Sequence, residues 1–271
     1  MNRHTYRLPT GMALAAGTPN FDHLAHIYRW MEMVTFGPWL LRCRCAFLGK
    51  LASRRNALVL GDGDGRFTAR LLRENPVVLI DALDASFAML MALVRNAGLN
   101  AGRVRVHQAD ARRWPPAGPP YDLIVTHFFL DCLTTDEVTT LATRLRPCVT
   151  PEALWVVSEF AVPPGPFGRL VALPVVSGLY LAFWLLTGLS VRRLPNHRVA
   201  LAKAGFSLVR QRCWLGGLLL SQLWAPESSG EGRRNMPPIR LPGFTSNVTS
   251  VLISNLKELA DLPFSTPDPS Q

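Results

Sequence analysis

The segment 56–66 constrains the fold of this chain most, because an apolar strand runs there directly into closely spaced glycines. It reads Asn-Ala-Leu-Val-Leu-Gly-Asp-Gly-Asp-Gly-Arg, and the helix-like segment 67–73 follows. Glycine is needed where a backbone turns sharply from strand into helix or lies against a ligand, and a helix start offers free N–H groups. The segment therefore predicts a cofactor site.

Two common glycine loops do not fit these residues. A phosphate-binding P-loop ends in Gly-Lys-Ser/Thr, and none follows Gly65. A dinucleotide fingerprint requires G-x-G-x-x-G, whereas position 66 is arginine and position 67 is phenylalanine. The spacing G-x-G-x-G, followed by Thr68, resembles the first motif of the class I S-adenosylmethionine-dependent methyltransferases.

The second segment of this resemblance is the apolar run 76–84, which reads as a buried strand and leads into a helix with Met89-Leu90. A carboxylate about 20 residues beyond a glycine loop can accept both ribose hydroxyls of a nucleoside. We assign this role to Asp84, with Ala85 beside it in the cofactor site. The rival Asp81 would fall inside the strand.

Two further segments extend the resemblance over 56–160. The alternating strand 103–107 leads to Asp110 and Ala111, and the family implies that this aspartate faces the adenine amino group, which only an acceptor can satisfy. In the strand 121–126, the resemblance places the carboxyl end beside the transferred methyl group. The cofactor implied is S-adenosyl-L-methionine.

Alternating strands and helices predict a parallel sheet with helices on both faces. We expect strands near 57–61, 77–83, 103–107, 121–126 and 153–159, and helices near 66–74, 86–97 and 135–145. A capped helix at 196–204 and strands at 206–214 and 218–224 are similar to the closing elements of the ubiquinone and menaquinone C-methyltransferases and related small-molecule methyltransferases. The resemblance implies a Rossmann-like, doubly wound α/β sheet of seven strands in the order 3-2-1-4-5-7-6, the last strand antiparallel.

One position departs from the family pattern. An acidic residue often stands two positions before the first glycine, where this chain has Val59. Carboxylates lie instead inside the loop, at Asp62 and Asp64, and either could meet the methionine ammonium. Turn formation alone would also explain Asp64. The choice stays open, and both count as cofactor-binding candidates together with Gly61, Gly63 and Gly65.

Methyl transfer is an in-line displacement from a sulfonium, so the protein mainly holds nucleophile and methyl group aligned. A base is needed only where the acceptor is not already ionised. His127, at the end of the fourth strand, is the best-placed base and a further cofactor contact, with Asp131 next. A polar core role for His127 is an equal alternative. Phe128 and Phe129 indicate an apolar pocket wall.

These residues predict an enzyme that methylates a small aromatic or lipophilic acceptor, such as a quinone precursor. The alternatives are a phospholipid or macromolecule methyltransferase, which the net charge of +10 favours, and a catalytically inactive cofactor-binding regulatory protein. Nucleic acid is disfavoured, because the arginines are scattered and 126–129 lacks the Asn/Asp-Pro-Pro-Tyr/Phe motif of DNA methyltransferases. The acceptor atom and the oligomeric state do not follow from the sequence.

The cysteines and the N-terminus bear on compartment. There are five cysteines, an odd number, without CxxC pairs or histidines at ligand spacing, so we expect no metal site and a reduced, cytoplasmic chain. No continuous apolar stretch resembling a signal peptide lies near the N-terminus.

We divide the chain into a flexible N-terminus (1–19), a methyltransferase domain (20–225) and a disordered tail (226–271) with one helix near 248–261. The domain includes a helical preface (20–55), with helices at 21–34 and about 39–51, and an apolar cap insertion (161–194). In the family such a preface often packs over the cofactor. Asp22, Tyr28 and Arg42 could then reach the site or remain surface residues.

The run 170–191 in the cap carries no charge and is long enough to span a membrane as a helix. Pro174, Gly178 and Gly188 interrupt it, and the strands after it must rejoin the sheet. We interpret it as a lid over an apolar substrate pocket. A lid that also dips into a membrane surface, which would make the protein peripheral there, and a true span are the alternatives.

Overall fold

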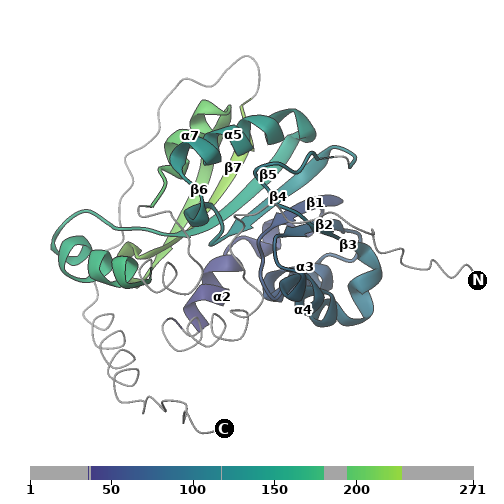
Figure 1. The fold of residues 1–271 in the computed structure, drawn as a ribbon, viewed down its shortest axis with the longest axis horizontal. Coiled ribbons are helices and arrows are strands. Elements are labelled where there is room, and N and C mark those ends of the chain that lie inside the picture. Colours follow the sequence, from purple (N-terminus) through teal and green to yellow (C-terminus); the bar gives the residue numbers. More distant parts are fainter. Residues whose placement is uncertain (1–35, 37, 117, 180–193, 228–271) are drawn as a thin grey trace, which may run out of the picture.

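The computed structural model describes residues 36, 38–116, 118–179 and 194–227 (Figure 1). Several predicted segments lie outside these residues: the N-terminus 1–19, the preface helix 21–34 with Asp22 and Tyr28, part of the cap (180–191), and the tail from 228 with its helix near 248–261.

A seven-stranded sheet forms the centre of the molecule, in the order β3-β2-β1-β4-β5-β7-β6 (Figure 1). The strands are β1 (Asn56–Leu60), β2 (Leu79–Asp84), β3 (Val104–Gln108), β4 (Tyr121–His127), β5 (Val149–Phe160), β6 (Phe206–Trp214) and β7 (Leu219–Pro226). The first five pair in parallel, and β7 is antiparallel to both β5 and β6. The predicted Rossmann-like topology, with the last strand antiparallel, is confirmed.

The helices are α2 (Pro38–Arg44), α3 (Arg66–Glu74), α4 (Phe87–Ala97), α5 (Thr135–Leu145) and α7 (His197–Lys203), with short 3-10 turns between some elements. Local sequence explains their starts: Ser86 and Asn196 cap α4 and α7, and Thr134 with Glu137 forms a capping box on α5. The expected single helix at about 39–51 is wrong. Its α-helical part ends at Arg44, and a separate 3-10 turn covers Leu48–Lys50.

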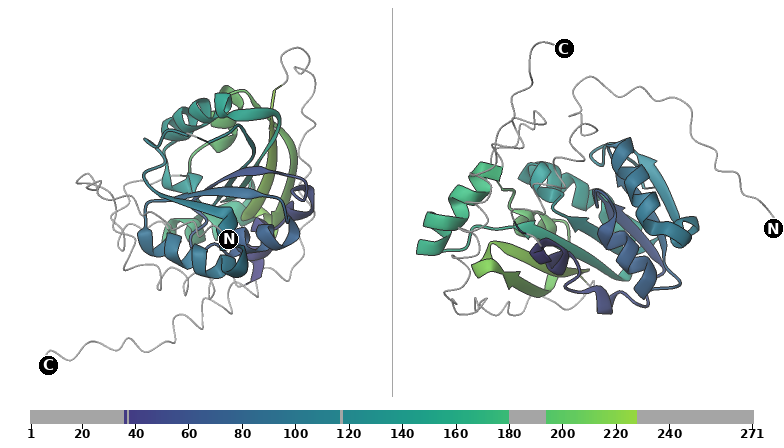
Figure 2. Two further views of the ribbon diagram at one scale, coloured as in Figure 1. Left: turned by 90° about the vertical axis from the view of Figure 1, so that its right-hand side faces the viewer. Right: turned by 90° about the horizontal axis from the view of Figure 1, so that it is seen from below.

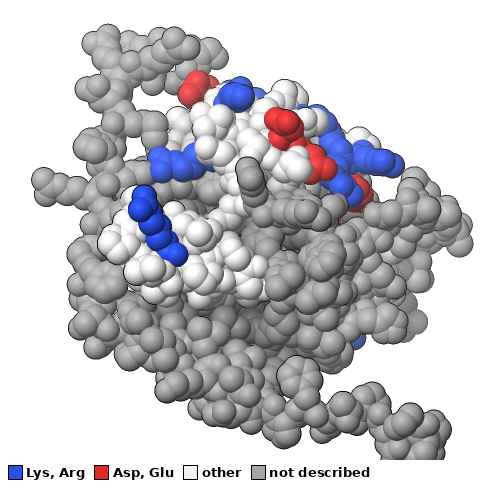
Figure 3. Space-filling view, turned by 60° about the vertical axis from the view of Figure 1, so that its left-hand side comes forward, with Lys and Arg blue, Asp and Glu red and all other residues white. Residues whose placement is uncertain are grey.

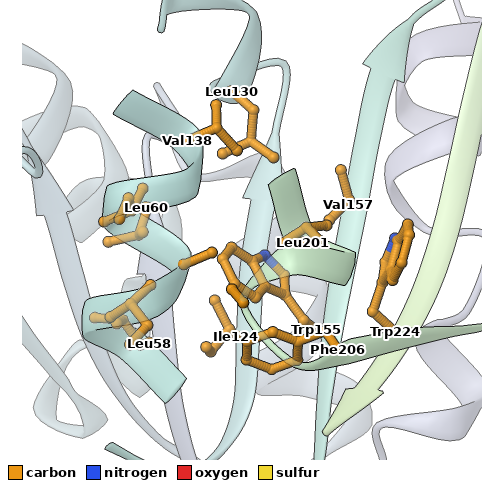
Figure 4. Close-up of a cluster of buried hydrophobic side chains, with 14 of the residues drawn as sticks. Leu58, Leu60, Ile124, Leu130, Val138, Trp155, Val157, Leu201, Phe206 and Trp224 are labelled. Atoms are coloured by element: carbon orange, nitrogen blue, oxygen red, sulfur yellow. The ribbon is translucent and has the colours of Figure 1, made fainter. Parts of the chain in front are cut away.

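Helices cover both faces of the sheet and enclose two apolar cores (Figures 1 and 2). One core lies under α5 and α7 around Trp155 (Figure 4). The indole N–H of Trp155 donates to the hydroxyl of Thr126 over 3.0 Å. The other lies under α3 and α4, around Phe67. Each large apolar side chain buried in this way stabilises the fold by about 1.5–3 kcal/mol. The sheet edge is thereby held as a rigid platform.

A third apolar cluster joins the described part of the cap to α2 and to the end of β5. The cap begins as a π-helical turn, Gly168–Ala172, and continues as an α-helix through 179. Ala172 and Val176 are buried against this cluster, whereas Leu170 is 76% exposed. Within 36–179 and 194–227, the described residues, no helix combines the length and apolar character that crossing a membrane requires.

Candidate active site

The glycine loop after β1 holds all three of its glycines at positive φ: 66° at Gly61, 61° at Gly63 and 77° at Gly65. A side chain at Gly61 would meet the ring of Phe129, and one at Gly65 would meet the backbone of Leu93 at 2.7 Å. A Cβ at Gly63 would have no atom within 4 Å. The loop is thus packed tightly at both ends and leaves room for a ligand at its middle.

The two loop aspartates have different surroundings. The carboxylate of Asp62 is buried, and its Oδ2 accepts hydrogen bonds from the N–H and the hydroxyl of Thr68, at 2.8 and 2.7 Å. Burial raises the pKa of Asp62 to about 6, although the charge of Arg44 opposes the rise. Its Oδ1 has no hydrogen-bond partner within the described chain. Asp64 instead pairs with Arg66 at 3.0 Å.

The predicted ribose ligand, Asp84, lies at the end of β2, and its Oδ1 accepts the N–H of Ser86 over 2.9 Å. Its neighbour Ala85 accepts a bond from Gln108 through its carbonyl. The rival Asp81 lies inside the strand, as expected, and its carboxylate is occupied by protein donors: Arg105, His107 and Tyr121.

Past β3, the candidate Asp110 forms an ion pair with Arg112, which approaches its Oδ2 to 2.7 Å. Burial alone would raise the pKa of Asp110, but the hydrogen bonds and charge of Arg112 lower it. Ala111 is buried in the core under α5. A role for these residues in holding adenine stays a prediction.

The imidazole of His127 lies at the end of β4 with only 2% of the residue exposed. Its Nδ1 shares a hydrogen bond of 2.9 Å with the hydroxyl of Ser158 on β5, and its ring meets that of Phe67 edge-on, with centroids 4.4 Å apart. Burial and the charge of Arg44 hold the pKa of His127 well below its usual range. The ring is therefore neutral, and its Nε2 has no partner among the residues described.

Arg44, the last residue of α2, is a site residue that sequence reasoning missed. It is 5% exposed, its guanidinium lies 5.4 Å from the ring centre of Phe128, and its charge acts on both Asp62 and His127. The named preface candidate Arg42 is exposed instead and stacks on Trp39. Helical spacing was the available signal, because Arg44 follows Leu40 by four positions on the buried face.

Asp131 lies in a 3-10 turn, Leu130–Cys132, just beyond β4. Burial raises the pKa of Asp131 to about 6. A second missed residue, Glu159 on β5, is 1% exposed, and its Oε1 accepts the N–H groups of Phe129 and Leu130, at 3.3 and 2.9 Å. The sequence feature that could have identified Glu159 is its place as a single acidic residue near the end of an apolar strand.

The fold thus brings residues from four parallel strands to one edge. The glycine loop follows β1, Asp84 ends β2, His127 ends β4 with Asp131 just beyond, and Glu159 lies near the end of β5. The order 3-2-1-4 places the switch point between β1 and β4, where open α/β sheets bind ligands. Within the described ranges, no group of histidine, cysteine or acidic side chains could hold a metal ion.

Comparisons with known proteins agree with this geometry. Residues 57–152 match the family described as "Methyltransferase domain". No curated protein matches the sequence significantly. Residues 57–152 are therefore similar to a methyltransferase domain, and the sheet order is that of the Rossmann-like methyltransferase fold.

Solved structures show the same fold. The mitomycin 7-O-methyltransferase MmcR is 18% identical with a TM-score of 0.55, covering 78% of this chain and 62% of its own. An O-methyltransferase family protein from Burkholderia thailandensis is 18% identical with a TM-score of 0.55, covering 80% and 66%. The methyltransferase CalO1 of calicheamicin biosynthesis, in its SAH-bound form, is 21% identical with a TM-score of 0.55, covering 76% and 59%. The chain spans less than two thirds of the length of each.

Proposed function

We propose that this chain transfers a methyl group from S-adenosylmethionine to an oxygen atom of a small aromatic or lipophilic acceptor. The observation that carries the proposal is the open position at Gly63, which lies at the same sheet edge as the carboxyl groups of Asp84 and Asp131. A ligand that passes over the glycine loop would have a ribose acceptor on one side and a base on the other.

The residues around the loop fit the cofactor. A side chain at Gly63 would occupy open space, which supports passage of the ligand there. Of the two loop aspartates, we propose Asp62 as the partner of the methionine ammonium, because its buried Oδ1 has no partner in the described part of the chain. Asp64 already pairs with Arg66. We propose that Asp84 accepts the ribose hydroxyls and Asp110 the adenine amino group.

A buried aromatic cluster at the ends of β4 and β5 supports a lipophilic acceptor. The rings of Phe128 and Phe160 have centroids 4.9 Å apart, and Phe36 packs on Phe160 at 5.3 Å. Phe129 covers the start of the glycine loop at Gly61. Matched structures that are named as O-methyltransferases support an oxygen acceptor over the carbon acceptor that the quinone-pathway resemblance implies.

The bound cofactor supplies an activated methyl group on a sulfonium. The chain then has to align the acceptor oxygen and remove its proton. We propose Asp131 as the base, because a carboxyl with a pKa of about 6 is ionised at neutral pH. We propose that His127, neutral and hydrogen-bonded to Ser158, lines the site and supports chemistry more than cofactor affinity.

Calorimetry with S-adenosylmethionine and its demethylated product tests the cofactor site. Gly63→Arg and Asp84→Ala should lose most of the affinity, because one fills the open position and the other removes the ribose acceptor. Gly98→Arg is the matched control: Gly98 also has a positive φ, of 56°, and open space at its Cβ, but it lies outside the loop, at the end of α4. Parent-like binding by both site variants would reject the assignment.

Mass spectrometry would identify the acceptor. Cell extract incubated with the protein and a donor labelled in its methyl group should yield a labelled apolar product. Tight cofactor binding without any labelled product would favour the alternative of an inactive, cofactor-binding regulatory protein.

A further inference from the structure

Two carboxyl groups, Asp131 and the buried Glu159, lie close enough beyond β4 to influence each other's charge. Glu159 reaches from β5 to the turn that carries Asp131, and its Oε1 accepts the N–H groups of Phe129 and Leu130. Its other oxygen, Oε2, is buried and has no hydrogen-bond partner among the residues described. A buried carboxylate oxygen without a donor is costly, whereas a protonated oxygen can itself donate.

The pKa shifts at this turn agree with the position of Glu159 beside Asp131. Burial and the charge of Asp131 raise the pKa of Glu159 well above its usual range. Burial and the charges of Asp131 and Glu159 likewise raise the pKa of the Cys132 thiol, and Asp84 adds to that effect. Two carboxyl groups that share a site cannot both ionise easily, so the pair keeps one proton.

Resting on the function proposed above, we propose that Asp131 and Glu159 form a carboxyl pair that holds a single proton, on Glu159, and that selects a hydroxyl acceptor. Glu159 is the protonated, positioning member, fixed by the backbone of the turn. Asp131 is the catalytic carboxylate.

In the reaction, the acceptor O–H bond breaks and its proton goes to the Asp131 carboxylate. The electron pair of that bond stays on oxygen, which forms the new bond to the methyl carbon. The carbon–sulfur bond breaks at the same time, and its electrons remain on the sulfur of the neutral thioether product. Asp131 returns its proton to water, while the proton on Glu159 stays in place and prevents a second negative charge beside the base.

Infrared spectroscopy of the full chain at neutral pH tests for this proton without any turnover. The parent should show the absorption of a buried protonated carboxyl group, and Glu159→Gln should abolish it. Glu152→Gln is the matched control, because Glu152 lies exposed on the same strand, and it should leave the band unchanged. A Glu159→Gln spectrum that keeps the band would overturn the proposal.

Methyl-transfer kinetics then test the roles of Asp131 and Glu159. The labelled donor is offered either the lipophilic phenol 1-naphthol or the corresponding amine, 1-naphthylamine. Asp131→Asn should lower transfer to the phenol by roughly 10²- to 10⁴-fold while cofactor affinity stays near that of the parent. Glu159→Gln should retain transfer and leave the acid limb of the pH profile near 6, because glutamine replaces a group that is already neutral.

If Glu159→Gln lowers the apparent pKa of that acid limb by about one unit or more, Glu159 is ionised in the parent, and the proposal is overturned. Transfer to the amine alone would overturn the hydroxyl assignment. The proposed function fails separately, by loss of cofactor binding in the parent chain. If neither probe is methylated, the infrared result decides.

Discussion

The carboxyl groups in the two halves of the sheet differ in the direction in which their pKa values are shifted. On the β2–β3 side, Asp81 and Asp110 meet arginines, and burial, which alone would raise the pKa of each, is outweighed by those partners, so that both values are lowered. On the β4–β5 side, burial raises the pKa of both Asp131 and Glu159. The surroundings of the same chemical group therefore favour its ionised form in one half and its protonated form in the other.

The neighbours explain this difference. β3 is an edge strand, and its Arg105, with 65% of its side chain exposed, pairs with Asp81 on the neighbouring strand β2. β5 lies between β4 and β7, and the third apolar cluster packs at its end. A central strand under an apolar cover brings desolvation, whereas an edge strand allows compensation by charge.

The positive charge of the chain is partly used inside the fold. Among the described residues, five arginines donate to backbone carbonyls of distant segments: Arg54, Arg103, Arg144, Arg146 and Arg212. On the face in Figure 3, basic side chains stand apart, with acidic ones among them, on a largely uncharged described surface. These contacts reduce the weight of the net charge as an argument for a polyanionic substrate.

Among the variants that test this comparison, the largest expected change in turnover after Asp131→Asn concerns His127. We expect His127→Ala to lower turnover by roughly 10²-fold, since acceptor and base lose the wall that aligns them, while calorimetry shows near-normal cofactor binding. The control is His197→Ala, which removes another buried histidine, hydrogen-bonded to Gln222 on the far face. Equal loss of affinity and turnover in His127→Ala would make it a structural residue.

A pair of isosteric variants tests the comparison through stability. Asp81→Asn should lower the free energy of unfolding by about 1–3 kcal/mol, because the carboxylate accepts from three side chains. Asp131→Asn should leave it unchanged or raise it at neutral pH, because burial disfavours the ionised form there. Urea denaturation of both measures this, and equal destabilisation would contradict the contrast.

The pH dependence of stability should have opposite signs in the two halves. The lowered pKa values of Asp81 and Asp110 contribute stability above the ordinary aspartate value, and that contribution is lost as pH falls through their folded values. The raised pKa of Asp131 contributes stability at low pH that is lost as pH rises to about 6. Thermal unfolding of Asp81→Asn should therefore show a weaker acid loss than the parent. An unchanged acid limb would reject the contribution of Asp81.

The smallest effect concerns the cap. We propose that the described start of its apolar run, 170–179, covers the acceptor and is not an anchor, since it packs on the domain at Ala172 and Val176. Cell fractionation should recover the protein in the soluble fraction, or from membranes washed in high salt, because each flanking arginine adds only about 1 kcal/mol near an anionic surface. Recovery only with detergent would favour insertion.

Much of the fold followed from local pattern. The helices at Arg66–Glu74 and Thr135–Leu145 begin and end where expected, because the periodicity of both and the capping box of the second depend on residues only a few positions apart. The glycine loop and Asp84 were recognisable for the same reason, since their spacing is short. β5 begins at Val149, earlier than expected, because pairing with its neighbour overrides the proline at 151.

The sequence by itself determined the order of elements, the glycine loop and the acids that end the strands, because each depends on neighbours a few positions away. Only the tertiary structure decided which acid is ionised. Arg44 is 18 positions from Asp62, and Glu159 is 28 from Asp131. Neither electrostatic interaction can therefore be read from neighbouring residues in the sequence. Burial and charge act through space, and the sheet brings these residues together only after the strands between them have paired.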